Sequence, residues 1–288
     1  MQQRPFRQID VFSHHPGFGN PVAVVLDAQG LSDADMRRFA AWTNLSETTF
    51  LMPPTAAGHA AGADYRLRIF SPRGELPFAG HPTLGTCRAW LQQGHTPRVP
   101  GLVVQESAQG LVQIEHQGNT LAFAAPPLQR SKPSPALVPL VASALGLRPH
   151  QIRATQLLDN GPVWLGLLLD SADTVLGLTP DHARLKDLGQ DVGVIHIAPD
   201  AGADPERPGA VVRAFAAPMG NPEDPVTGSL NASLAQWLIA EGLAPTRYLV
   251  AQGECLGRAG RVYIHQDAQG QVWVGGHTVT CIEGTALL

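Results

Sequence analysis

ELPFAGHPTLGTCRAWLQQG, residues Glu75–Gly94, has a near copy later in the chain, EDPVTGSLNASLAQWLIAEG at Glu223–Gly242. In both copies an acidic residue is followed five positions later by a glycine, Gly80 or Gly228, and an amphipathic segment then runs to a final glycine. Apolar residues at helical spacing predict a helix in each copy, and the final glycine is typical of a helix C-terminus. The chain therefore builds one glycine-opened helix twice.

The likeness extends upstream of both helices. RIFSP at Arg68–Pro72 matches RAFAAP at Arg213–Pro218, so that Arg-x-Phe, Glu and Gly follow in one order in each half. Any two α+β halves share an alternation of strands and helices, but that alternation does not explain shared residues. Self-similarity at a long spacing indicates two copies of one supersecondary design. The sequence predicts an α+β fold of two pseudo-symmetric halves.

Composition places the chain among soluble globular proteins. Of its 288 residues 44% are hydrophobic and 15% are charged, with a net charge of −4. The charges are scattered, which disfavours a nucleic-acid or membrane partner, and no apolar run is long enough to cross a bilayer. Cys87, Cys255 and Cys281 are too far apart for a disulfide framework or a zinc spacing. We expect a cytoplasmic, metal-free protein, since the N-terminal residues contain no secretory apolar segment.

Apolar patterns predict the remaining elements. A helix is expected over 33–44 with Ser32 as its cap, because Asp33 and Asp35 then lie in its first turn. The proline-dense run around 125–139 has no periodicity and is interpreted as a linker, leading into a helix over 135–146. Strands are expected at 6–12, 21–26, 48–54, 65–72, 101–107, 111–124, 162–169, 193–199, 210–218, 247–254, 261–267 and 271–279.

Two like halves that face each other would place two helix N-termini on opposite sides of one cleft. A helix N-terminus exposes backbone N–H groups and the positive end of the helix dipole, which suits a carboxylate or a developing enolate. Gly80 and Gly228 would let a ligand approach the backbone closely. Facing helix starts could thus hold a small anionic molecule from both sides.

Four polar side chains could carry the chemistry. His81 and Ser229 follow the two glycines, and Asp224 precedes the second helix. Each also has a structural interpretation: proline after His81 suits a first helical turn, serine is an ordinary cap, and an acid favours a helix dipole. Glu47 is a single acid among small polar residues, so shielding would raise its pKa toward the range of a general acid or base, although a surface charge is an equal alternative.

Other catalytic patterns fit less well. PGFGNP lacks the third glycine of a dinucleotide fingerprint, and His14–His15 form no metal spacing with a nearby ligand. A racemase that uses two thiols would place a cysteine at each helix N-terminus, where the dipole lowers the thiol pKa. Those positions hold His81 and Ser229, whereas Cys87 lies within its helix and suits the core. Two-cysteine racemisation is therefore disfavoured.

With these motifs in place, the chain resembles the PhzF family, which is named for the isomerase of phenazine biosynthesis. The resemblance covers essentially the whole length. Six ordered motifs carry it: VFSHHPGFGNPVAVV, NLSETTF, RIFSPRGELPFAGHPTLG, DNGPVWL, RAFAAPMGNPEDPVTGSLNASLAQWL and GECLGRAGRVYI.

The resemblance implies a diaminopimelate epimerase-like fold, in which each lobe is a curled, mostly antiparallel sheet around a central helix. It implies that the last strand, around 279–288, returns to the first half. The N-terminal lobe is then expected to comprise 1–128 plus 279–288 and the C-terminal lobe 129–278, with the active site in the cleft between them. It further implies a homodimer that works without cofactor or metal.

The resemblance also implies roles for individual residues. Glu47 corresponds to the glutamate that moves a proton, and His81 and Asp224 correspond to the motif residues beside it. Substrate binding is expected at Gly80, Gly228, Ser229 and Thr227. The implied reaction is a proton shift on a small carboxylated metabolite, similar to that of trans-2,3-dihydro-3-hydroxyanthranilate isomerase. The alternative is a non-catalytic protein that keeps the two-lobed fold to bind a small molecule or a partner.

Overall fold

The computed structural model describes residues 2–288, which form two compact units. Unit 1 comprises residues 2–124 together with 275–288, and unit 2 comprises 125–274. The divisions expected from the sequence, after 128 and after 278, lie four residues later in each case. Among the described residues no helix has the length and apolar character needed to span a membrane.

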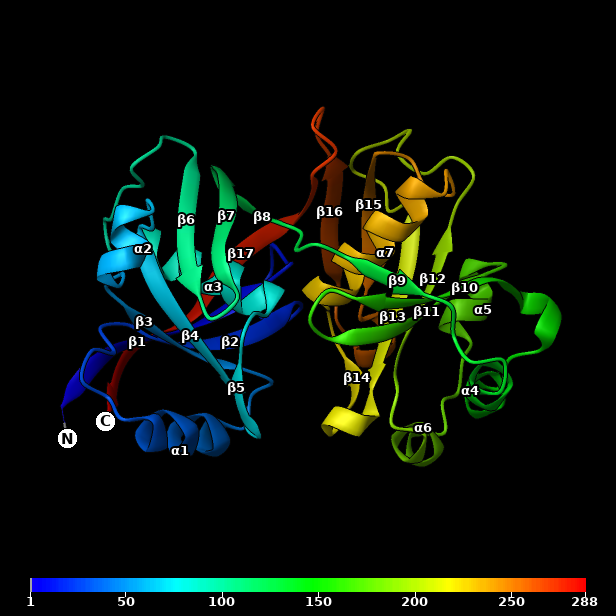
Figure 1. The fold of residues 1–288 in the computed structure, drawn as a ribbon, viewed down its shortest axis with the longest axis horizontal. Coiled ribbons are helices and arrows are strands. Elements are labelled where there is room, and N and C mark those ends of the chain that lie inside the picture. Colours follow the sequence, from blue (N-terminus) through cyan, green and yellow to red (C-terminus); the bar gives the residue numbers. More distant parts are fainter. Residues whose placement is uncertain (1) are drawn as a thin grey trace. The chain divides into compact units, whose positions relative to one another are not determined.

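Unit 1 is a closed ring of strands around helix α3 (Figure 1). Antiparallel and parallel pairings alternate in the order β1–β2, β2–β3, β3–β4, β4–β6 and β6–β7. β7 continues antiparallel to β8, and β17 closes the ring by pairing with both β8 and β1. The elements are β1 (Gln3–Val11), β2 (Asn20–Val25), α1 (Asp33–Thr43), β3 (Thr48–Met52), α2 (Ala56–Ala60), β4 (Tyr65–Ser71), β5 (Gly74–Leu76), α3 (Gly80–Gln92), β6 (Leu102–Ser107), β7 (Gly110–Gln117), β8 (Thr120–Ala124) and β17 (Val272–Leu287).

Helix α3 lies in the core of unit 1, and its residues from Gly80 to Trp90 are all buried. A side chain on Gly85 would bring its Cβ to 2.3 Å from Val22 of β2 and 3.2 Å from Val11 of β1. Glycine is therefore required where the helix crosses these strands, because packed interiors leave no room for an added methyl group.

Unit 2 repeats the same order of pairings. β10–β11 is antiparallel, β11–β12 parallel, β12–β13 antiparallel, β13–β15 parallel and β15–β16 antiparallel. Helix α7 packs on one face of this sheet, with Leu234 and Trp237 against Gly166. The elements are β9 (Gln129–Ser131), α4 (Leu137–Leu145), β10 (Ile152–Asp159), β11 (Val163–Leu169), α5 (Ala172–Leu176), α6 (His182–Leu188), β12 (Asp191–Ile197), β13 (Ala210–Ala216), β14 (Asn221–Asp224), α7 (Gly228–Ala240), β15 (Arg247–Gln252) and β16 (Gly260–Gln266).

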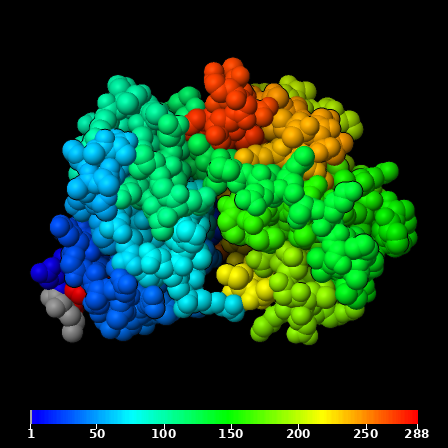
Figure 2. All heavy atoms as spheres, in the orientation of Figure 1, coloured from blue at the N-terminus to red at the C-terminus, as the bar shows by residue number. Residues whose placement is uncertain are grey.

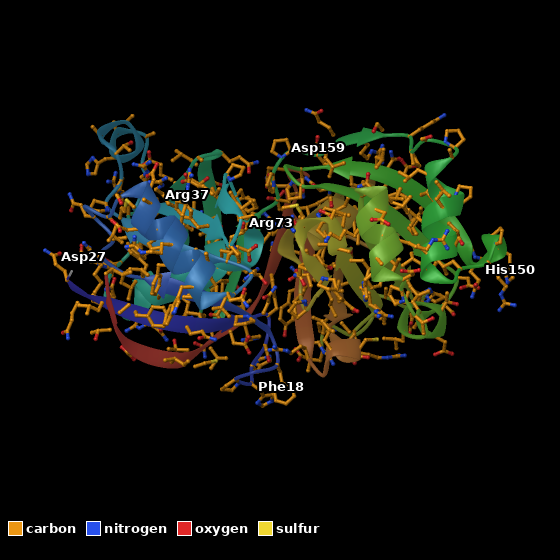
Figure 3. All side chains as sticks on the ribbon, turned by 90° about the horizontal axis from the view of Figure 1, so that it is seen from below. Phe18, Asp27, Arg37, Arg73, His150 and Asp159 are labelled. Atoms are coloured by element: carbon orange, nitrogen blue, oxygen red, sulfur yellow. The ribbon has the colours of Figure 1, made fainter. Side chains whose placement is uncertain are left out.

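The opposite face of the unit 2 sheet packs on a second core that includes Leu165, Leu167, Val192 and Val194. Helices α4 to α6 contribute Val141, Val175 and Leu185 to it. The exposed parts of residues 137–150, in the green range of the colour bar, show on the surface of unit 2 (Figure 2), and His150 projects from that surface (Figure 3).

The repeated Arg-x-Phe…Glu pattern has one physical meaning in both units. Arg68 donates from Nε and Nη2 to both carboxylate oxygens of Glu75, at 2.7 and 2.6 Å. Arg213 makes the same paired contact with Glu223, at 2.9 and 2.8 Å. Each guanidinium also lies over the phenylalanine two residues later, about 5 Å from the ring centroid. The duplicated residues thus hold together the hairpin that precedes each glycine-opened helix. We call the pairs Arg68–Glu75 and Arg213–Glu223 the hairpin locks.

The structure corrects several expected elements. The expected strand 111–124 is a hairpin of β7 and β8, because Gly118 takes a positive φ of 59° and turns the chain. The expected linker contains β9, which pairs with β10. β10 has no counterpart among the expected strands, because its residues are mostly half-buried without strict alternation. Asp224, expected in a loop, ends strand β14.

Candidate active site

Glu47 and His81 lie together in unit 1. Glu47 is the residue just before β3, and His81 is the second residue of α3. Glu47 Oε2 is 3.3 Å from His81 Nε2. The two side chains are 16% and 6% exposed, so the contact is shielded from solvent while the carboxylate keeps some access. The structure thus brings together two of the residues that the sequence nominated for proton transfer.

The ionisation of His81 follows from its surroundings. Burial lowers the pKa of His81 to about 3, and the hydrogen bond from the ring to the Pro21 carbonyl opposes this only in part. The imidazole is therefore neutral near pH 7. Because Nε2 faces Glu47, Nδ1 is the nitrogen left to donate to Pro21, and Nε2 carries the lone pair. If Glu47 takes up a proton, its O–H can donate a hydrogen bond to His81 Nε2. This arrangement can therefore stabilise the protonated form of Glu47.

Helix α3 begins without a side-chain cap in the described chain. Its N-cap residue is Ala79, and within the described chain no side chain makes a capping hydrogen bond there. Pro82 has no N–H, so the backbone donors of the first turn next to Glu47 and His81 are those of Gly80 and His81. Two N–H groups and the positive end of the helix dipole can stabilise negative charge on a substrate oxygen.

Unit 2 holds Asp224 in a defined orientation. Its Oδ2 accepts from Thr227 Oγ1 at 2.6 Å, and its Oδ1 accepts from Asn221 Nδ2 at 3.2 Å. Gln252 Nε2 donates to Thr227 Oγ1 at 3.0 Å, and Gln252 Oε1 accepts from the Thr227 N–H at 3.1 Å. The Thr227 hydroxyl therefore serves as a link between Asp224 and the buried amide of Gln252.

The start of α7 matches that of α3. Thr227 is its N-cap residue, and in residues 2–288 no side chain makes a capping hydrogen bond there. Ser229 is the second helical residue and not the cap, which excludes the simple capping role considered for it. Ser229 Oγ accepts from Trp164 Nε1 at 3.3 Å, and Ser229 O accepts from Asn160 Nδ2 at 2.8 Å.

The residues expected at the site from the sequence did not include Asn160, Trp164 or Gln252. Asn160 and Trp164 belong to the DNGPVWL motif, which begins at Asp159 at the end of β10 (Figure 3). Gln252 ends β15 and is only 1% exposed. Gln252 could have been found from the sequence, because a polar residue at the end of an apolar strand pattern is often paired or functional when it is buried.

Comparison with known proteins gives one family. A family model described as phenazine biosynthesis-like protein, PhzC-PhzF, matches residues 9–284. Antisense-enhancing sequence 1 of Schizosaccharomyces pombe is 35% identical and aligns over the whole of both chains. Trans-2,3-dihydro-3-hydroxyanthranilate isomerase of Pseudomonas aeruginosa is 33% identical, with 97% of this chain and 98% of the relative covered.

A solved structure shows the same fold. The phenazine biosynthesis protein of the PhzF family from Bacillus anthracis superposes with a TM-score of 0.83 at 23% identity, over the whole of both chains. The predicted fold class is confirmed by this agreement.

Proposed function

Because the chain belongs to the PhzC/PhzF family of phenazine biosynthesis-like proteins, we propose that it is an isomerase that shifts a proton on a small carboxylated metabolite. The observation that carries the proposal is the 3.3 Å contact between Glu47 Oε2 and a neutral His81 Nε2 beside an uncapped helix start. General acid/base catalysis needs a carboxylate that can accept and return a proton within a partly shielded site, and Glu47 meets this requirement.

The proposed reaction uses Glu47 as its general acid and base. The carboxylate takes a proton from an acidified carbon of the substrate, and the negative charge moves to a substrate oxygen that the N–H groups at the start of α3 stabilise. The proton stays on Glu47 through its contact with His81 Nε2. Glu47 then returns it to another carbon or to the other face, so protons and charge balance without a cofactor or a metal.

Asp224 has the second role in this proposal. Thr227 and Asn221 hold its carboxylate in one orientation, as expected of a group that fixes a substrate hydroxyl or amine. We propose that Gly228 and Ser229, at the uncapped start of α7, are substrate-binding residues. Backbone N–H groups at such a helix start suit a substrate carboxylate.

The first test is an absorbance assay with trans-2,3-dihydro-3-hydroxyanthranilate in deuterated water, comparing wild type with Glu47→Gln. We expect wild-type turnover with deuterium gain, and a loss of about 100- to 10,000-fold in kcat in the variant with little change in binding. Glu206→Gln, at an exposed loop position, is the control and should behave as wild type. A kcat of Glu47→Gln within about threefold of the wild-type value would contradict the assignment of Glu47 as the general acid and base.

If the wild-type protein shows no turnover of this compound, its substrate is another small carboxylic acid, and the alternative of a binding protein gains support.

We also propose that the protein is a cytoplasmic homodimer, on the basis of its resemblance to the family. Light scattering on the purified protein measures its mass directly, and a monomer mass at micromolar concentration would reject the homodimer.

A further inference from the structure

Two buried amide side chains lie behind the loop that leads into α7. Gln252, the last residue of β15, is 1% exposed, and Asn231, in the first turn of α7, is 2% exposed. Asn231 Nδ2 donates to the Thr227 carbonyl and to Gln252 Oε1, both at 2.8 Å. The Thr227 N–H also donates to Gln252 Oε1, at 3.1 Å. Gln252 Oε1 therefore accepts two hydrogen bonds in a region that is shielded from solvent.

The Gln252 amide can adopt only one orientation. Its Nε2 donates to the Asp224 carbonyl at 3.1 Å and to Thr227 Oγ1 at 3.0 Å. The Asp224 carbonyl can only accept and the Thr227 N–H can only donate, so these two backbone groups fix which end of the amide is oxygen and which is nitrogen. A flipped amide would place donor against donor and acceptor against acceptor.

This orientation decides where the proton of the Thr227 hydroxyl lies. In the described chain Thr227 Oγ1 has two hydrogen-bond contacts, Gln252 Nε2 and Asp224 Oδ2. Because Nε2 is a donor, the hydroxyl accepts from it and gives its own proton to Asp224 Oδ2. The 2.6 Å distance between Thr227 Oγ1 and Asp224 Oδ2 is typical of a hydroxyl that donates to an ionised carboxylate. Asp224 Oδ2 is therefore an acceptor and carries no proton.

The donors form a chain that runs in one direction, from Asn231 through Gln252 and Thr227 to Asp224. Successive hydrogen bonds in such a chain strengthen one another, and hydrogen bonds donated to a carboxylate favour its ionised form. Asn221 Nδ2 adds a donor to the other oxygen, Oδ1, at 3.2 Å. Amides and hydroxyls do not change charge near neutral pH, so the direction of the chain is permanent.

We infer that the buried amide of Gln252 is a positioning group, which directs the Thr227 hydroxyl proton onto Asp224 and keeps that carboxyl ionised. Asn231 supports this role by holding Gln252 Oε1. Asp224 then serves the reaction as a fixed hydrogen-bond acceptor and not as a proton donor, which leaves Glu47 as the group that takes up and returns the proton. The inference rests on the proposed function in that Asp224 contacts the substrate.

The first test locates the proton in the wild-type protein. Neutron diffraction from crystals of the perdeuterated protein near pH 7.5 should show the Thr227 hydroxyl deuterium directed at Asp224 Oδ2 and no deuterium on Asp224. A deuterium on either carboxyl oxygen of Asp224, or a Thr227 deuterium turned toward Gln252, would overturn the inference. This test needs no variant, so it decides the inference even if a variant does not fold.

The second test measures the effect of the amide in solution. Labelling aspartate with ¹³C at the side-chain carboxyl gives signals whose chemical shifts follow protonation, and Asp224→Asn identifies the signal of Asp224. Gln252→Met removes the amide donor and frees Thr227 Oγ1 to accept from a protonated Asp224. We expect the titration midpoint of Asp224 to move to higher pH by about half a pH unit or more. Asn231→Leu should move it less, and Thr227→Val, which removes the hydroxyl donor itself, should move it further.

Gln236→Met is the matched control. Gln236 lies two turns further along α7, and its amide donates to the Pro126 carbonyl at 3.0 Å. The control removes an equivalent amide from the same helix and should leave the midpoint of Asp224 at its wild-type value. A wild-type midpoint in Gln252→Met, or a shift of equal size in Gln236→Met, would reject the role of the Gln252 amide.

These outcomes are separate from that of the proposed function, because neither the diffraction nor the titration requires turnover or a ligand. If Glu47→Gln kept wild-type turnover, the proposed mechanism would fail while the ionised state of Asp224 could still be established. An Asp224 that carries a proton would reject the inference and leave the assignment of Glu47 intact.

Discussion

His81 links the catalytic proposal to stability at the scale of a single residue. Its folded pKa of about 3 lies below its ordinary value of 6.5. As the pH falls below about 6.5 the unfolded chain takes up a proton that the folded chain excludes, so stability is lost progressively down to pH 3 and is fully present above pH 6.5. Acid therefore weakens the fold at the same group that accepts a hydrogen bond from protonated Glu47 in the proposed reaction.

We predict that His81→Gln loses less stability on acidification than wild type. Between pH 7 and pH 5 the difference should be about 2 kcal/mol, from 1.36 kcal/mol per pH unit below the unfolded pKa. Urea unfolding at the two pH values measures it. His277, whose pKa burial lowers to about 4, adds to the acid sensitivity of both proteins and cancels in the comparison. His150→Gln, at the exposed position in Figure 3, is the control, and parallel pH slopes for His81→Gln and wild type would contradict the prediction.

A second prediction concerns Thr227, whose hydroxyl joins Asp224 to Gln252. Thr227→Val keeps the shape but removes the link, so buried groups of Asp224 and Gln252 lose a partner. We expect a loss of about 1–3 kcal/mol in the free energy of unfolding together with a lower kcat. Thr227→Ser should restore both quantities. If valine and serine gave the same kcat, the hydroxyl would have no part in orienting Asp224.

At the scale of elements, the two hairpin locks use the same paired Arg–Glu contact but differ in burial, and Arg68 has a second carboxylate partner in Asp33 at 2.7 Å. Arg213 and Glu223 are 6% and 7% exposed, whereas Arg68 and Glu75 are 16% and 31% exposed. Arg213 also donates to the carbonyls of Val175 and Leu178, which ties β13 to α5. The Arg213–Glu223 pair in unit 2 is therefore more shielded from solvent, and leaving its arginine unpaired costs more free energy of unfolding.

We predict that Glu223→Gln destabilises the protein more than Glu75→Gln. Leaving a buried charge without its partner costs about 3–5 kcal/mol, while an exposed pair contributes about 0–1 kcal/mol and a half-exposed one lies between these values. Chemical denaturation of the two variants compares the same substitution at equivalent positions. Equal losses would show that burial does not separate the two locks.

For the whole molecule, β17 connects the two units along the chain. Its residues Val272–Val274 belong to unit 2, and its remainder closes the ring of unit 1 against β1 and β8. Gly275 is needed at the crossing, because a Cβ there would lie 2.5 Å from the Leu121 carbonyl oxygen. The ring of unit 1 is thus completed by the last strand of the chain, far from β1 in sequence.

We predict that a chain ending at Val274 loses the ordered ring of unit 1, since β1 and β8 would each lose a neighbouring strand. Hydrogen exchange should show loss of protection in β1, β8 and α3, with α7 retaining protection because unit 2 has its own core. A chain ending at Gly284 keeps the pairing of Phe6 with Gly284 and is the control. Full protection of α3 in the shorter chain would disprove this role of β17.

Local features of the fold could be predicted from the sequence because they depend on residues close together in the chain. Ser32 caps α1 as expected, accepting from the Asp35 N–H. The two glycine-opened helices begin at Gly80 and Gly228, as their patterns indicated. β10 was not predicted because its half-buried residues show no clear hydrophobic period. β9 was not predicted because it has only three residues and lies in a proline-dense run that is typical of a linker.

The sequence by itself determined the duplication, the family and the nomination of Glu47, His81, Asp224 and Ser229, since each rests on residue order or on neighbouring residues. Only the tertiary structure decided that His81 is neutral and offers Nε2 to Glu47, because its pKa depends on burial and on the Pro21 carbonyl. The contacts of Asn160 and Trp164 with Ser229 likewise emerged only from the fold, because these residues are far from Ser229 in the sequence and meet it only in the folded unit.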